Sequence, residues 1–115
     1  MTGRYTVEHE PDQSRYVLVD REAGASQPEE IGEESYVDVE GERVLYHTVV
    51  SDEYAGQGLA SLLVREVVED TIASGLRIVP VCPYVAAWLP KHPEYAEHVA
   101  ERRAEHGAAV RARVG

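Results

Sequence analysis

The sequence has few of the features on which secreted and membrane proteins depend. It contains one cysteine, Cys82, so no disulfide can form within the chain. No apolar run approaches the ~18 residues that a membrane-spanning helix needs, and residues 1–13 lack the apolar stretch of a signal peptide. These absences favour a reducing, intracellular setting, and we expect a cytoplasmic protein.

Positive charge is also scarce. The 115 residues include 11 Lys and Arg but 21 Asp and Glu, which gives a formal net charge of −10. Nucleic acids and anionic membranes require a basic surface, so we expect neither as a partner. The excess of acidic residues leaves two interpretations open: it suits a cationic substrate such as an amine, or it serves solubility alone.

Apolar residues alternate with a period close to two over the first half of the chain, which predicts strands. A polar loop over residues 24–32 interrupts the pattern, and Glu40-Gly41 is a turn that indicates a hairpin. The predicted strands are Tyr5–Val7, Arg15–Asp20, Ser35–Val39 and Arg43–Val50.

A long segment with helical spacing follows the hairpin. Gly75 stands after it, where the C-terminal glycine of a helix belongs. The next run, Leu76–Val81, is predicted to be a strand, in which Pro80 must face an edge or a gap because it has no N–H to donate. The apolar positions of the helix are Leu59, Leu62, Leu63, Val67 and Ile72.

The last third of the chain predicts short helices. Pro83 suits a first helical turn that continues to Leu89, and Glu94–Glu105 is a candidate for a last helix. A strand, a glycine turn, a helix and a second strand form a βαβ unit with parallel strands. The fold class is therefore α/β (α+β), with a mixed sheet of about five strands, a long helix after the glycine turn and one or two C-terminal helices.

The stretch Val49–Ala60 has the properties of an anion site. Gly56 and Gly58 open the predicted helix, where backbone amides lack intrahelical partners and the helix dipole adds positive charge. The phosphate-loop pattern is absent, and Ser61 and Cys82 stand where a dinucleotide fold requires a small residue and an acid. Coenzyme A is the remaining candidate ligand, and a glycine-rich helix start without any ligand is the alternative.

These residues resemble a known family. Ala55-Gly56-Gln57-Gly58-Leu59-Ala60 is similar to the acetyl-CoA-binding motif [Q/R]-x-x-G-x-[G/A] of the GNAT superfamily, except that Ala55 replaces the usual Gln or Arg. With His47–Val50, Val79–Val85 and His92–Tyr95, it resembles the small, single-domain GNAT-like N-acetyltransferases of the YjdJ type. We therefore expect one such domain over residues 1–106 and a flexible tail over 107–115.

The resemblance implies how the coenzyme would bind. In this superfamily two neighbouring parallel strands, here Arg43–Val50 and Leu76–Val81, part and admit the pantetheine arm between them. The gap would also accommodate Pro80. The implied contacts with acetyl-CoA are made by Val49, Val50, Ala55, Gly56, Gln57, Gly58, Leu59 and Ala60, and by Lys91 and His92 at the adenosine phosphate.

Three residues are candidates for the chemistry. Cys82, between a strand and a helix, could accept the acyl group as a nucleophile or lie near the coenzyme thiol, and as a free cysteine it could simply be a small buried side chain. His47 has the pKa range of a general base, and Tyr84 could protonate the leaving thiolate, although both could equally be packing residues. The histidines lack the spacing of a metal site, so we expect no metal.

Together these observations predict an acetyl-CoA-dependent N-acetyltransferase that acts on an unidentified small or protein-borne amine, as a monomer or weak homodimer. Two alternatives remain: a coenzyme A-binding sensor or interaction module without turnover, and a phosphate- or nucleotide-binding domain that uses the same amides. Direct transfer and transfer through an acyl-Cys82 enzyme are both open.

Overall fold

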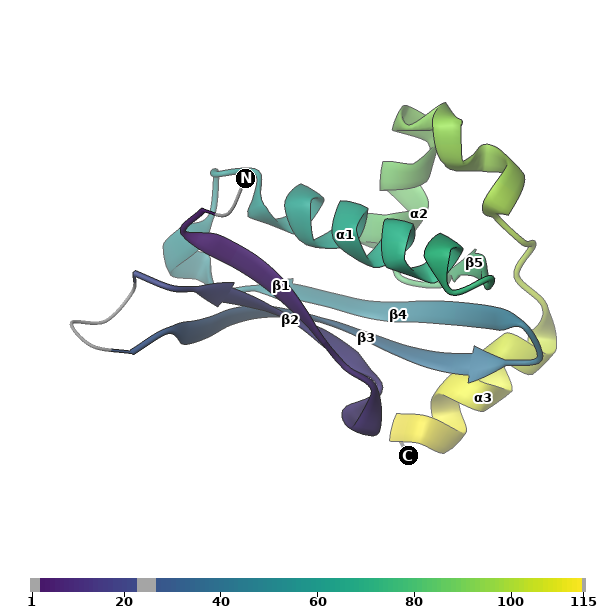
Figure 1. The fold of residues 1–115 in the computed structure, drawn as a ribbon. Helices are drawn as coiled ribbons and strands as arrows, with labels where there is room; N and C mark the ends of the chain where they lie inside the picture. The colour runs from purple at the N-terminus through teal and green to yellow at the C-terminus, as the bar shows by residue number, and fades with distance from the viewer. Residues whose placement is uncertain (1–2, 23–26, 115) are drawn as a thin grey trace.

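The protein folds around one mixed sheet, described here from a computed structural model over residues 3–22 and 27–114 (Figure 1). The first four strands pair antiparallel, and the last two pair in parallel across the intervening helix, as the sequence predicted. In spatial order the strands are β1 (Tyr5–Glu10), β2 (Arg15–Asp20), β3 (Glu29–Val39), β4 (Glu42–Val50) and β5 (Arg77–Pro80). The helices are α1 (Leu59–Ala73), α2 (Pro83–Trp88) and α3 (Ala104–Val114), with 3₁₀ turns η1 (Pro11–Gln13), η2 (Asp52–Tyr54), η3 (Leu89–Lys91) and η4 (Pro93–His98).

Two strands are longer than predicted. β1 continues to Glu10, and β3 starts at Glu29, inside the segment predicted to be a polar loop. Residues 24–26 of that loop lie outside the described residues. The polar start of β3 is a strand because its backbone pairs with both neighbours, and Gly32 allows a close approach: a Cβ there would lie 2.9 Å from the carbonyl oxygen of Val49.

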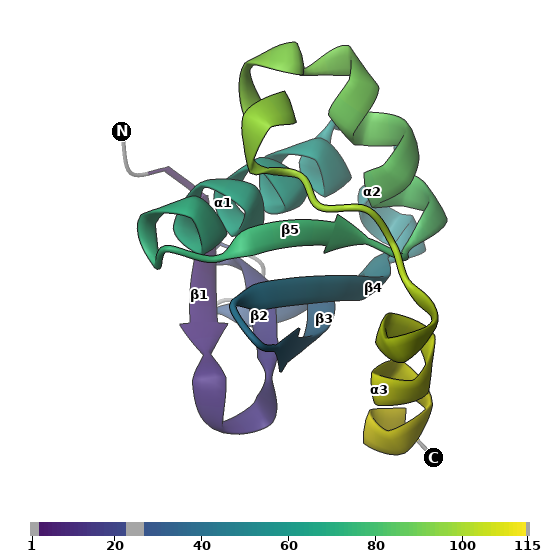
Figure 2. The ribbon, with the colours of Figure 1, turned by 90° about the vertical axis from the view of Figure 1, so that its right-hand side faces the viewer.

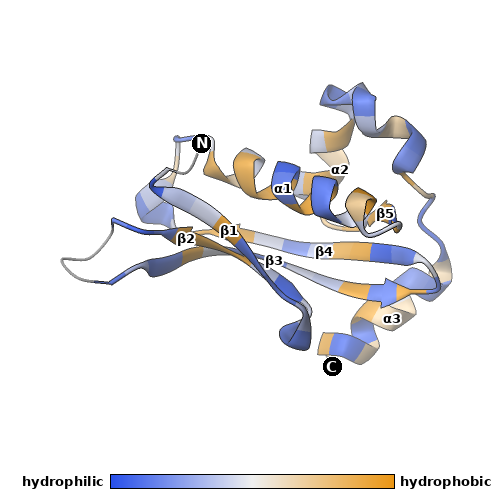
Figure 3. Ribbon diagram, in the orientation of Figure 1, coloured by the Kyte–Doolittle hydropathy of each residue, from blue (hydrophilic) through white to orange (hydrophobic). Residues whose placement is uncertain are grey.

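Helices cover both faces of the sheet. Figure 1 shows α1 and α2 over one face and α3 over the other. Apolar residues on α1 meet apolar residues in the middle of the sheet (Figure 3) and form the main core, which includes Leu18, Leu45, Leu63, Val67 and Trp88. A smaller cluster of Val44, Val79 and Ala100 lies on the other face, with Val110 of α3 packed against it.

The last helix lies later in the chain than predicted. Glu94–Glu105 does not form one helix, because the backbone after η4 follows the edge of β5, where the Ala100 N–H donates to the Ile78 carbonyl (2.8 Å). Figure 2 shows this segment passing β5 before α3 begins. The predicted tail supplies most of α3, which is anchored by the fully buried His106.

Pro80 lies on an edge rather than beside a gap. The N–H groups of Arg77 and Val81 donate toward β4, to the carbonyls of Gly41 and Leu45. Because backbone groups alternate along a strand, the Pro80 nitrogen faces the opposite side, where β5 has no further strand. The missing N–H therefore costs the sheet no hydrogen bond.

Candidate functional site

β4 and β5 are joined at one end and separate at the other. They pair only from Glu42↔Arg77 to Leu45↔Pro80, after which β4 continues to Val50 paired with β3 but not with β5. We call the paired half, residues 42–45 with 77–80, the closed end, and the half formed by residues 46–50 with 81–82 the open end. The Leu45 carbonyl marks the boundary, since it accepts from the N–H groups of both Val81 (3.0 Å) and Cys82 (2.9 Å).

A β-bulge sits at the start of the open end. Opposite β3, His47 pairs with Ser35 and Leu45 pairs with Tyr36, so Tyr46 has no partner of its own. An extra residue of this kind bends its strand and increases the local twist. The bulge therefore provides a local cause for the departure of β4 from β5, and it also shifts by one the side-chain alternation that follows.

The chain leaving β4 forms a hollow of about 380 Å³ at the start of α1. Most of its lining comes from the end of β4, the following loop and the start of α1, and Tyr84 of α2 completes it. The hollow is lined by Val50, Ser51, Tyr54, Ala55, Gly56, Gly58, Leu59, Ala60 and Tyr84.

Free backbone amides face this hollow. Gly56 (φ +83°) and Gly58 (φ +73°) have left-handed conformations that favour glycine, and a Cβ at either position would meet no atom within 4 Å. Gly58 is the N-cap residue of α1 and supplies no side-chain cap, so within the described ranges the amides of residues 59–61 have no acceptor. The first turn of α1 also carries no acidic side chain. Its positive dipole end is therefore available to an anion.

A buried carboxylate fixes the loop that carries the glycines. Asp20 of β2 accepts hydrogen bonds from Arg4 Nε (2.8 Å) and from the Tyr54 hydroxyl. The Arg4 guanidinium, followed by the Tyr54 hydroxyl, holds the pKa of Asp20 well below its usual range. Tyr5 adds a hydrogen bond to Gln57 Oε1 (3.2 Å), so the side chain of Gln57 is directed toward β1.

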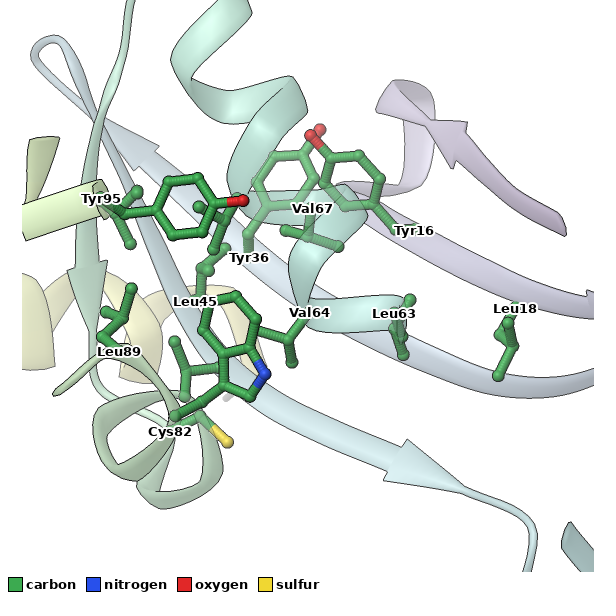
Figure 4. Close-up of a cluster of buried hydrophobic side chains, with 14 of the residues drawn as sticks. Tyr16, Leu18, Tyr36, Leu45, Leu63, Val64, Val67, Cys82, Leu89 and Tyr95 are labelled. Atoms are coloured by element: carbon green, nitrogen blue, oxygen red, sulfur yellow. The ribbon is translucent and has the colours of Figure 1, made fainter. Parts of the chain in front are cut away.

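Cys82 lies in the core at the open end, 5% exposed, as the residue before α2 (Figure 4). Its Sγ is 3.2 Å from the Thr48 hydroxyl, which donates a hydrogen bond to Oε1 of Glu34. Glu34 is fully buried, and among the described residues nothing pairs with its Oε2. A buried oxygen without a partner costs about 1–3 kcal/mol.

Burial controls the charge of Glu34. Removal from water raises its pKa to about 9, against the opposing effect of the Thr48 hydrogen bond. The carboxyl group is therefore neutral at pH 7. Sequence reasoning missed this residue, although one signal was present: Glu34 lies two residues before Tyr36, and alternation along a strand places both on the core face.

The structure does not bring His47 to Cys82. The side chain of Thr48 contacts Cys82, so the neighbouring His47 projects from the opposite face of β4, where it is exposed. Tyr84, in contrast, lines the hollow, and partial burial raises the pKa of its hydroxyl. Of the three residues predicted for the chemistry, Cys82 and Tyr84 lie at the open end or the hollow on the same side of the sheet.

One of the two residues predicted for the adenosine phosphate, His92, is connected to the first turn of α1. His92 stacks on Trp88 with ring centroids 3.7 Å apart, and Trp88 Nε1 donates to the Ser61 hydroxyl (2.8 Å). Lys91 ends η3 and is exposed. Val50 lines the hollow, whereas the Val49 side chain is exposed.

Within residues 3–22 and 27–114, no cluster of three or more His, Cys, Asp or Glu residues could hold a metal ion. None of the helices in these ranges has the length and apolar character needed to cross a bilayer.

Comparisons with known proteins agree with this geometry. A family model described as GCN5-related N-acetyl-transferase matches residues 15–99. The NMR solution structure of a GCN5-like protein from Staphylococcus aureus is similar, with a TM-score of 0.62 and 25% sequence identity over 91% of this chain and 97% of that chain. Among curated proteins, none matches the chain.

Proposed function

Since this chain belongs to the GCN5-related N-acetyltransferase family, we propose that it transfers an acetyl group from acetyl-CoA to an amine. One observation supports the proposal above the others: the hollow with free amides at the start of α1 adjoins the open end of the β4–β5 pair. A diphosphate and a peptide-like arm need these two features side by side.

The hollow would hold the diphosphate. The amides of Gly56, Gln57 and Gly58 and of the first turn of α1 would donate to its oxygens, and the absence of Cβ atoms leaves room for them. These contacts come from the backbone, so they do not need the Gln or Arg that Ala55 replaces. Lys91 and His92 would lie toward the adenosine end.

The open end would hold the pantetheine arm. Beyond Leu45, β4 has no partner on the β5 side, so its backbone can pair with the amides of the arm as a strand would. Val49 and Val50 are the residues we expect to pair. The thioester would then lie near Cys82, where the apolar surroundings of Leu45, Leu89 and Trp88 exclude water.

The reaction needs a neutral amine, a polarised thioester carbonyl and a proton for the departing thiolate. In direct transfer, the amine nitrogen attacks the carbonyl carbon, the carbon–sulfur bond breaks, and a nearby acid protonates the sulfur. Tyr84 and Cys82 are the nearest candidate donors. His47, on the other face of β4, would act only on an amine that arrives from that face.

Calorimetry and a turnover assay test the proposal. We expect acetyl-CoA to bind with a dissociation constant below ~1 mM, and the absence of binding at that concentration would refute the proposal. Incubation with acetyl-CoA and a panel of polyamines, lysine peptides and aminoglycosides should release coenzyme thiol above the control without amine. Binding without release would instead indicate a non-catalytic coenzyme A-binding module.

The route through Cys82 has its own test. If Cys82 carries the acetyl group, mass spectrometry of the intact protein should detect an acetyl adduct that Cys82→Ser lacks. If transfer is direct, no adduct forms. The order in which the two substrates bind is then the same in Cys82→Ser as in the wild type.

A further inference from the structure

A chain of three polar side chains leads from the core of the sheet to the open end. Glu34 on β3 faces Thr48 on β4, and Thr48 faces Cys82 after β5. The three residues come from distant parts of the sequence. In the described part of the chain, Glu34 Oε2 is the only buried polar side-chain atom without a hydrogen-bond partner. Through Thr48, the carboxyl group that carries this oxygen is linked to Cys82, near which the reacting sulfur is expected.

Among the described residues, no cation is hydrogen-bonded or ion-paired to the Glu34 carboxyl. Its cross-strand neighbour on β2 is Tyr16, whose hydroxyl is already bonded to Asp70 and to Arg43 Nη1 (2.7 Å). Its neighbour on β3 is Glu33, which bonds Arg15. The buried residues of α1 are all uncharged, as are those of α2. The titratable groups near its carboxyl are Cys82 and Glu33, with Tyr16 opposite it on β2.

We propose that Glu34 is a positioning residue that, through Thr48, keeps Cys82 supplied with the proton that the departing coenzyme thiolate requires. The inference rests on the proposed function for the identity of the thiolate. It depends on the geometry of the three side chains for the path of the proton.

The proton transfers balance along this path. When the carbon–sulfur bond breaks, its electron pair stays on the coenzyme sulfur, which takes the proton of the Cys82 thiol. The Thr48 hydroxyl, which at rest donates to Glu34 Oε1, turns to give its proton to the Cys82 sulfur 3.2 Å away, and it takes the carboxyl proton of Glu34. Glu34 is left as a carboxylate. It recovers a proton by the reverse path, through Cys82 and Thr48, and the acetylated amine releases an equivalent proton, so the cycle closes without another reactant.

The direction of transfer follows from burial. A carboxyl group with a pKa of about 9 is protonated at neutral pH, so Glu34 can donate a proton and cannot accept one from Cys82. A relay that made Cys82 a nucleophilic thiolate would need the opposite state of Glu34. The arrangement therefore favours a proton donor over a base.

The first experiment needs neither coenzyme nor turnover. Because Cys82 is the only cysteine, ¹³C-cysteine labelling gives one side-chain signal to follow with pH. We expect the signal to change as Glu34 loses its proton near pH 9 in the wild type, a step that Glu34→Gln lacks. The matched control, Glu33→Gln, changes the same group one residue away and should keep this step. Identical curves for the wild type and Glu34→Gln would overturn the coupling.

The second experiment compares kcat at different pH values. Glu34→Gln should lower kcat about tenfold or more at pH 7, and the ratio of wild type to variant should fall toward one above pH 9, where wild-type Glu34 loses its proton. Thr48→Val, which interrupts the path but keeps the shape, should also lower kcat at pH 7. A ratio that stays constant with pH would show a structural role and refute the relay.

A failure of the proposed function and a failure of the proton relay give different results. If acetyl-CoA does not bind or no thiol is released, the proposed function fails, while the labelled-cysteine titration still reports on the coupling. If turnover occurs and the cysteine curves of wild type and Glu34→Gln coincide, the function stands and the relay is wrong.

Discussion

The closed and open ends of the β4–β5 pair use the same two strands in opposite ways. At the closed end polar groups have partners: Glu42 accepts from Arg103 Nη2 (2.8 Å) and contacts His106 Nε2 (2.7 Å). At the open end and the adjoining hollow, Glu34 Oε2 and the amides at the start of α1 have none among the described residues. Stability is concentrated where groups are paired, and the unpaired groups lie where a ligand is expected.

The boundary between the two ends is one residue wide. The Leu45 carbonyl accepts two N–H groups, and the bulge at Tyr46 follows at once. A fold can therefore keep a well-packed sheet and still present free backbone groups, provided that a local irregularity separates the two regions. Substitutions at either end test whether the two ends are independent of each other.

The largest expected effect is at the closed end. Ile78→Ala removes a fully buried side chain of β5 and should lower the free energy of unfolding by about 2–5 kcal/mol, measured by urea denaturation. The affinity of the folded protein for acetyl-CoA should change little. Ile78→Val is the milder companion, with an expected loss of about 0.5–1.5 kcal/mol. A large loss of affinity in Ile78→Val would show that the two ends are not separable.

The next effect concerns Glu34 at the open end. Because its pKa is raised above that of the unfolded chain, its contribution to stability is complete below about pH 4.3 and is lost as pH rises toward about 9. The wild type should therefore lose stability relative to Glu34→Gln by up to about 1.4 kcal/mol per pH unit between pH 5 and 8. Denaturation curves at several pH values measure this difference. A difference that does not grow with pH would mean that Glu34 is ionised in the folded protein.

Much of the fold was predictable because local patterns agree with tertiary structure. β2 and α1 match their predicted positions, since alternation and helical spacing there coincide with the buried faces. The start of β3 was not predictable from its polar residues, because backbone pairing with two neighbours forms it. The position of α3 was not predictable either, since contacts of His106 and Arg103 with Glu42, far away in sequence, hold it.

The site was predictable where backbone geometry defines it. The free amides near Gly56 and Gly58 follow from a glycine turn before a helix, and the structure has them. The face of β4 on which His47 lies was not predictable: unbroken alternation from Leu45 would put His47 on the Cys82 face, but the bulge gives that place to Thr48. A bulge leaves no clear trace in one sequence.

The third prediction separates binding from stability at the hollow. Ala60→Asp places a negative charge in the first turn of α1, which has none. The charge should favour the helix dipole and raise the free energy of unfolding by about 0.3–1 kcal/mol, while it repels the diphosphate and weakens acetyl-CoA binding about tenfold or more. Calorimetry and denaturation measure the two effects, which have opposite signs.

Ala112→Asp is the matched control for this prediction. It adds the same charge at an exposed position of α3, away from the residues that line the hollow. Its affinity for acetyl-CoA should equal that of the wild type. Equal affinities for all three proteins would remove the start of α1 as the diphosphate site.

The smallest expected effect concerns Glu42 at the closed end, and its pH dependence has the opposite sign to that of Glu34. Hydrogen bonds from Arg103 and then from His106 lower the pKa of Glu42. A lowered pKa gives stability that is present above the ordinary value for glutamate, about 4.3, and is lost as pH falls through the folded value. The melting temperature of the wild type should therefore fall more steeply than that of Glu42→Gln between pH 5 and 3. If the two slopes are equal, the contacts of Glu42 do not stabilise the closed end. If they differ as expected, acid weakens the closed end and alkali weakens the open end, because one carboxyl group has its partners and the other is buried with an oxygen unpaired.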